Sequence, residues 1–129
     1  MRGLVGNSLG VRDFRKIVAW QRADELVRVV YQVAEGLPTA ERFGLAAQMK
    51  RAAVSIASNI AEGAGRSSDP DFERFLSIAA GSASEVQYQL DLAKRLWPSI
   101  EGTDVALGLA HEVKRMLRSL QRASRANRA

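Results

Sequence analysis

The sequence is most basic near its C-terminus, and the residue types there suit the binding of phosphate groups. Residues 111–129 hold six lysines and arginines against Glu112 alone, whereas residues 1–110 hold 13 basic and 13 acidic residues. The C-terminal stretch therefore carries the whole net charge of +5. An arginine guanidinium can donate to two phosphate oxygens at once. At helical spacing the basic residues share an arc of ~100° with His111; they are Lys114, Arg115, Arg118, Arg122 and Arg125.

The opposite side of the same stretch is apolar, with Leu109, Val113, Met116, Leu117 and Leu120. Because an apolar side must pack against the rest of the protein, the basic side is expected to face outward. The pattern predicts a surface that binds RNA or DNA through phosphates, with little sequence preference because nothing in it is suited to reading base edges. The alternative is a solvated basic face that only aids solubility.

A second set of polar residues lies along one line of a predicted helix: Gln48, Arg51, Ser55, Asn59 and Glu62. Arg66 continues the same spacing but lies beyond Gly63. Serine and asparagine are unfavourable in an exposed helix interior, because their side chains compete for backbone hydrogen bonds. Their presence at this spacing indicates a close, hydrogen-bonded contact with a neighbouring helix.

A turn at Ser67-Ser68 would set this line against the following segment, so that the numbers of opposed residues sum to about 136 in an antiparallel hairpin. The opposed pairs are then Arg51 with Glu85, Ser55 with Gly81, Asn59 with Ser77, and Glu62 with Arg74. Two pairs have opposite charges, and the glycine would let two backbones approach. We interpret them as a structural polar seam; chance pairing of two solvated faces and a ligand site are the alternatives.

Other arrangements that could support catalysis are incomplete. The chain has no cysteine, and His111 is its only histidine, with no acidic residue four positions away. The acidic cluster of Asp69, Asp71 and Glu73 is explained by the start of a helix. Residues 63–66 form too short a glycine segment for a phosphate loop. We therefore expect no enzyme activity, no cofactor and no metal ion.

Length and composition fit a single globular domain. The chain has 129 residues, of which 47% are hydrophobic and 26% charged. No apolar run approaches the ~20 residues that span a bilayer, and the first twelve residues contain no apolar core of a secretory signal. These features predict a soluble, cytoplasmic protein without a membrane partner.

Prolines and glycines divide the chain into four segments of helical period. They span about residues 17–35, 41–62, 68–96 and 103 onward. No segment has the alternation of a strand. Short connections favour antiparallel neighbours, so we predict an all-α fold, an up-down-up-down four-helix bundle over residues 13–122. Residues 1–12 and the basic residues 123–129 are expected to be flexible.

Apolar stripes support this architecture. The third segment has a repeat of 3.5 residues in Phe72, Leu76, Ala79, Ala83, Val86, Leu90, Ala93 and Trp97. The second has a similar stripe in Leu45, Met49, Ala52, Ile56 and Ile60. In the first segment the apolar residues cover roughly 200° of the helix, more than one small bundle needs to bury. We expect a homo-oligomer to cover the remainder.

The polar line is part of a longer motif. Residues 41–63, ERFGLAAQMKRAAVSIASNIAEG, resemble the core motif of the four-helix bundle family encoded in intervening sequences of bacterial 23S rRNA genes. The resemblance extends over most of the chain, through Trp20-Gln21, Leu26, Gly65-Arg66, Phe72, Phe75-Leu76, Ala79, Gly81-Ser82 and Glu85. The chain departs from the family pattern at Lys50, often arginine, at Ala57, often proline, and in its basic extension beyond Leu120.

The resemblance implies an antiparallel bundle that assembles into a homopentameric ring. The chain is also similar to the accessory variability proteins of diversity-generating retroelements, which bind nucleic acid and a reverse transcriptase through a basic surface. Two functions are therefore considered: a nucleic-acid-binding or ribonucleoprotein accessory, and a scaffold that presents a surface to a protein partner. Steep salt dependence of binding would favour the first.

Overall fold

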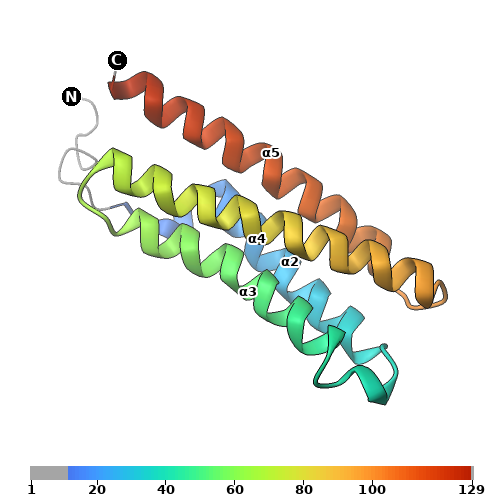
Figure 1. The fold of residues 1–129 in the computed structure, drawn as a ribbon. Helices are drawn as coiled ribbons and strands as arrows, with labels where there is room; N and C mark the ends of the chain where they lie inside the picture. The colour runs from blue at the N-terminus through green and yellow to red at the C-terminus, as the bar shows by residue number, and fades with distance from the viewer. Residues whose placement is uncertain (1–11, 129) are drawn as a thin grey trace.

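A computed structural model describes residues 12–128, which form helices and connecting turns without a strand. The elements are η1 (Phe14–Lys16), α2 (Val18–Glu35), η2 (Thr39–Glu41), α3 (Leu45–Ala64), α4 (Asp69–Leu96) and α5 (Thr103–Arg128), where η marks a short 3-10 helix. The four long helices lie side by side (Figure 1). The predicted all-α class is confirmed.

The four helices close into a bundle in which each packs against two others. The contacting pairs are α2 with α3, α3 with α4, α4 with α5, and α5 with α2. Because the connections are short, successive helices run antiparallel. The α3–α4 turn and the C-terminal end of α5 lie at one end of the bundle, while the α2–α3 and α4–α5 connections lie at the other (Figure 1).

Local chemistry explains where the helices begin. The Ser68 side chain caps α4 by accepting a hydrogen bond from the Asp71 backbone N–H at 3.2 Å. Gly102, just before α5, has a φ of +92°, which favours glycine. The second helix was predicted from about residue 41, but α3 begins at Leu45. Residues 39–41 instead form a 3-10 turn, and Glu41 Oε1 accepts a hydrogen bond from the Leu45 backbone N–H at 3.2 Å.

The predicted stripes form the core. All members of the α4 stripe are buried except Trp97, which is partly buried, and the α3 stripe is buried except for the partly buried Leu45. The wide apolar arc of α2 is mostly covered within the chain, contrary to expectation. The α4–α5 connection contributes, because Gly102 lies against Val33 and Val29. Among the large apolar residues of α2, Val18 and Tyr31 remain exposed.

The ends of the domain differ from the predicted boundaries. Helix α5 continues through Arg128, so most of the segment expected as a tail is helical. At the other end, the expected flexible residues 1–11 lie outside the described residues. Arg12 is fixed by its backbone N–H, which donates to the carbonyl of Ala64 at 2.9 Å. No helix within residues 12–128 is long and apolar enough to cross a membrane.

Candidate nucleic-acid interface

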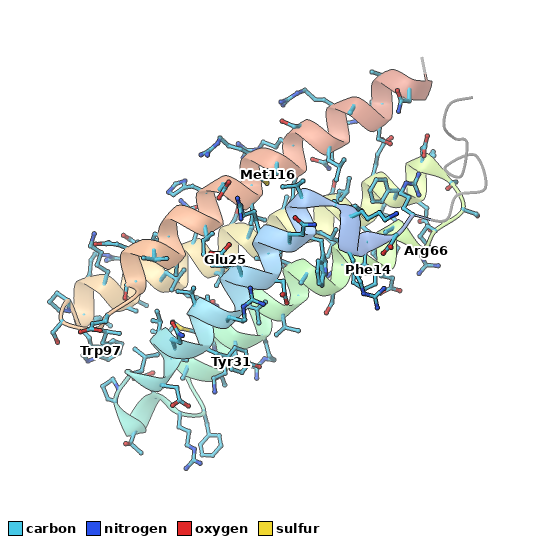
Figure 2. The ribbon with its side chains drawn as sticks, turned by 180° about the vertical axis from the view of Figure 1, so that it is seen from behind. Phe14, Glu25, Tyr31, Arg66, Trp97 and Met116 are labelled. Carbon is cyan, nitrogen blue, oxygen red and sulfur yellow. The ribbon has the colours of Figure 1, made fainter. Side chains whose placement is uncertain are left out.

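Packing sets the rotation of α5 and thereby the direction of its basic residues. Val113 and Leu117 are fully buried, and Met116 lies partly buried where α5 meets α2 (Figure 2). An ion pair between Arg22 of α2 and Glu112 of α5, at 3.3 Å, joins the same two helices. With one side of α5 fixed against the bundle, its other side faces solvent.

Three arginines on that outer side have no acidic partner. Arg115, Arg118 and Arg122 are exposed, and none of them forms an ion pair with any residue in the described range 12–128. Arg122 donates to Ser119 Oγ at 3.2 Å, a contact within its own helix. We call these three residues the α5 arginine row. Their guanidinium groups can therefore donate hydrogen bonds to a phosphate without first releasing a bound carboxylate.

The two other predicted phosphate ligands are partly engaged within the chain. Lys114 is half-buried, and its Nζ donates to Oε1 of Gln87 on α4 at 3.2 Å. Arg125 pairs with Glu73 of α4, with 3.6 Å between Nε and Oε1, although its side chain remains 61% exposed. Both residues therefore help to dock α5 on α4, and both still present cationic groups beside the α5 arginine row.

Glu73 is a site residue that the sequence pattern did not reveal. It is 7% exposed, accepts a hydrogen bond from Ser124 Oγ at 2.7 Å and faces Arg125. Sequence reasoning explained it only as an acid near a helix N-terminus. Its partners would have been visible only if α5 had been extended through residue 125, because Ser124 and Arg125 lie beyond the predicted bundle boundary at residue 122.

Residues of the predicted polar seam form hydrogen bonds with partners other than those predicted. Ser55 Oγ lies 2.8 Å from Ser82 Oγ, one residue beyond the predicted Gly81. The Asn59 side chain donates to the Ser55 carbonyl at 2.8 Å and to its Oγ at 3.0 Å. Its predicted partner, Ser77, instead accepts a hydrogen bond from Gln121 of α5 at 2.7 Å. The centre of the α3–α4 contact is thus satisfied mainly by serine and asparagine.

The charged members of the seam do not pair as predicted. Glu62 pairs with Arg66 at 2.9 Å, and Arg74 pairs with Asp71 at 3.0 Å. In both pairs the partner is only three or four residues away in the sequence, rather than across the seam. Arg51 and Glu85 form no ion pair with each other. They line a shallow groove of about 270 Å³ together with Gln48, Ala52, Ser55 and Ser82.

The other side chains that could take part in metal binding or acid–base chemistry lie on α3, α4 and α5. Residues 12–128 contain no cluster of three or more histidine, cysteine or acidic side chains that could hold a metal ion. His111 is exposed on α5, with its Nε2 3.3 Å from Nε2 of Gln87. The serines of the seam bond to one another and to Asn59, and Glu85 lines the same groove as Ser55 and Ser82.

Comparison with known proteins assigns the family. The family model described as "23S rRNA-intervening sequence protein" matches residues 15–119. A crystal structure of a protein with unknown function from the S23 ribosomal protein family of Bacteroides thetaiotaomicron superimposes with a TM-score of 0.73. That protein is 25% identical in sequence, and the match covers 81% of this chain and 96% of that one. No curated protein matches. The chain belongs to the 23S rRNA-intervening sequence protein family.

Proposed function

We propose that this protein is a non-catalytic, nucleic-acid-binding accessory of a ribonucleoprotein or reverse transcriptase. In this proposal Lys114, Arg115, Arg118, Arg122 and Arg125 contact phosphates. The observation that carries it is the α5 arginine row: three exposed guanidinium groups without a carboxylate partner in the described residues. Such groups attract a polyanion over several ångströms and release its counterions on contact.

The expected ligand is RNA or DNA without a strong sequence preference. Arginine side chains on one outward helix face can follow a backbone, while sequence readout needs groups aligned with base edges in a groove. The chemistry therefore predicts an affinity that falls steeply with salt and varies little with sequence. A cytoplasmic location, as the sequence predicts, would give the surface access to both kinds of nucleic acid.

Assembly into a homo-oligomer, a pentamer by resemblance to the family, is part of the proposal. Tyr31 on α2 is 44% exposed and Val54 on α3 is 39% exposed, and Lys50 Nζ lies 5.0 Å from the Tyr31 ring centre. Tyr31 and Val54 are exposed apolar side chains that a second copy could cover. An oligomer would repeat the α5 arginine row, so that several weak contacts act on one strand. Light scattering that returns a mass near 14.1 kDa at micromolar concentration would contradict this part.

A charge-matched comparison tests the binding proposal. The test variant carries Arg115→Gln, Arg118→Gln and Arg122→Gln, which leaves the Arg125–Glu73 pair intact. The control carries Arg28→Gln, Arg42→Gln and Arg51→Gln, which removes three exposed arginines from other parts of the bundle. We expect the test variant to bind a single-stranded RNA at least about 10-fold more weakly, with a salt slope lower by about 2. The control should change affinity far less.

Three results would contradict the proposal. They are an absence of RNA and DNA binding by the parent at low salt, a test variant that binds as tightly as the parent, and equal weakening by both variants. The last would mean that net charge, rather than this surface, governs binding. Salt-tolerant binding to a protein partner, without nucleic acid, would instead support a scaffold function.

A further inference from the structure

A second groove lies between α4 and α5, directly beside the α5 arginine row. It has a volume of about 410 Å³ and is lined by Gln87, Tyr88 and Asp91 of α4 and by Leu107, His111 and Lys114 of α5, among others. This volume falls within the range of small-ligand sites. Lys114 and Arg118 are one helical turn apart, so the groove opens towards the arginine row.

Tyr88 is the aromatic member of this groove, and its ring is largely uncovered. The residue is 60% exposed, and within residues 12–128 its ring stacks on no other ring and lies under no cation. Leu107, across the groove on α5, supplies an apolar side chain that packs against the core. An exposed aromatic face beside basic groups is the combination on which single-stranded nucleic acids stack their bases.

Lys114 and His111 of α5 both contact Gln87, the residue next to Tyr88. The side-chain amide of Gln87 bridges them, because its Oε1 accepts from Lys114 Nζ at 3.2 Å and its Nε2 lies 3.3 Å from His111 Nε2. This bridge draws the two α5 side chains towards α4, and both line the groove with Tyr88. The ammonium group of Lys114 keeps further donors for a phosphate oxygen.

The negative charge of Asp91, the acidic residue of the groove, is not left uncompensated beside a bound nucleic acid. Asp91 pairs with Arg95 on the same helix, at 3.2 Å, so its charge is partly compensated. Its position one turn after Tyr88 places a hydrogen-bond acceptor near the aromatic ring. An exocyclic amine of a base could donate to that carboxylate.

We propose that this groove is a stacking subsite in which Tyr88 receives one unpaired nucleobase while Lys114 holds the adjoining phosphate. The inference rests on the proposed nucleic-acid binding and adds a preference to it. Bases in a duplex are already stacked and paired, so they are not available to Tyr88. The protein should therefore favour single-stranded over double-stranded nucleic acid at equal length and salt.

Substitution of Tyr88 tests the subsite. The probe is a fluorescein-labelled 12-nucleotide RNA of mixed sequence, used alone and annealed to its complement. Tyr88→Ala should weaken binding of the single strand about 5- to 100-fold, the effect of losing one base–aromatic stack. Binding of the duplex should change less than about twofold, and the salt slope should stay the same because no phosphate contact is lost.

Two controls separate stacking from general damage. Tyr88→Phe keeps the ring and should bind the single strand as the parent does. Ile78→Ala removes a comparably exposed apolar side chain from α4, one turn before Ser82 and so on the side facing α3, and should have no effect. Thermal unfolding and light scattering of all three variants check that fold and assembly are retained.

The outcomes distinguish this subsite from the function on which it rests. If the parent binds RNA but Tyr88→Ala binds it equally well, the subsite is wrong and the phosphate-binding surface stands. Equal losses on single strand and duplex, or a loss with Tyr88→Phe as large as with alanine, would also overturn it. If the parent binds neither probe, the proposed function fails together with the subsite.

Discussion

Two groups of arginines in this bundle differ in whether they contact aromatic rings and carboxylates of the described residues. At the α3–α4 turn, Arg12, Arg66 and Arg74 form what we call the bundle-end cluster, where Arg66 marks its position in Figure 2. Their guanidinium carbons lie 4.2 to 4.7 Å from the ring centres of Phe72 and Phe75. On α5, the arginine row meets no ring and no carboxylate in the described part of the chain.

Acidic residues complete the contrast. Arg12 pairs with Asp69, Arg66 pairs with Glu62, and Arg74 pairs with Asp71. A phosphate approaching the bundle-end cluster would meet these carboxylates and would have to displace them, whereas the α5 row offers unoccupied donors. The same residue type thus contributes to stability in one region and is available for binding in the other. Partner geometry, rather than the number of charges, separates the two roles.

The largest expected effect is on the packing beneath the bundle-end cluster. A Cβ at Gly63 would lie 2.7 Å from Phe75 Cβ and 3.2 Å from Phe72 Cδ1, so α3 and α4 would have to separate. We expect Gly63→Ala to lower the free energy of unfolding by about 1–3 kcal/mol in urea denaturation.

The matched glycine lies on the outer face of α5. A Cβ at Gly108 meets no atom within 4 Å, and the residue is one turn before His111. Gly108→Ala should raise the free energy of unfolding by up to about 1 kcal/mol, because alanine is the better helix former. Destabilisation by both substitutions to the same extent would remove the contrast in packing between the two regions.

A crossed pair of arginine variants tests the contrast directly. Arg12→Gln removes the stacking on Phe72, the ion pair with Asp69 and a hydrogen bond from Nη1 to the Arg66 carbonyl at 3.2 Å. It should cost about 1–2 kcal/mol of stability without a specific loss of RNA affinity. Arg118→Gln should leave stability within about 0.5 kcal/mol and weaken RNA binding. If the two variants lost stability and RNA affinity to the same extent, the two groups of arginines would not differ in role.

A double-mutant cycle can distinguish real seam partners from residues that are merely near each other. Ser55→Ala with Ser82→Ala should show a coupling energy of about 0.5–1 kcal/mol, because their hydroxyls are 2.8 Å apart and half-buried. The cycle of Arg51→Ala with Glu85→Ala should be additive within about 0.3 kcal/mol, since the two side chains form no ion pair. Strong coupling of the charged pair would support the register predicted from sequence.

The smallest expected effect concerns an exposed pair at the α4–α5 connection. Lys94 Nζ lies 2.7 Å from Asp104 Oδ1, and this hydrogen bond, with the attraction of the same carboxylate, raises the pKa of Lys94. A raised pKa means that the folded state holds the proton more tightly than the unfolded state. The stabilisation is therefore complete below the ordinary lysine pKa of about 10.4 and is lost as the pH rises through the raised value.

Thermal unfolding of Lys94→Gln measures this contribution. The parent should have a slightly higher Tm at neutral pH, and the difference should shrink to zero at pH values above the raised pKa. Because the pair is exposed, the difference should also decrease with added salt. A difference that stays constant over the whole pH range would mean that the substitution acts through packing or helix propensity rather than charge.

Element type and core positions were accessible from the sequence, because they depend on periodicity and on glycine and proline signals. The α4 stripe from Phe72 to Ala93 is buried as predicted, and α4 begins just after Ser68. Side-chain partners were less accessible. The predicted hairpin register missed the Ser55–Ser82 pair by one residue, since the turn does not fix the relative rotation of the two helices.

The exposure of Arg115, Arg118 and Arg122 was predictable from helical spacing, whereas the ion pairs of other predicted site residues were not. Glu62 was assigned a partner across the seam, but Arg66 lies closer on its own chain segment. Arg125 was grouped with the phosphate ligands, yet it also pairs with the buried Glu73. Each of these outcomes depends on which of several neighbours is nearest, a question that helical spacing alone does not decide.

The extension of α5 through Arg128 has a thermodynamic consequence for any partner. A disordered basic tail would have to lose backbone entropy on binding, at about 1–2 kcal/mol for each residue that becomes fixed. A preformed helix has lost most of that entropy during folding. It also sets the spacing of its charges, because Arg115 and Arg125 are separated by about 15 Å along an axis that rises 1.5 Å per residue. The surface is therefore preorganised. Less of the free energy gained from each electrostatic contact is offset by a loss of backbone entropy on binding.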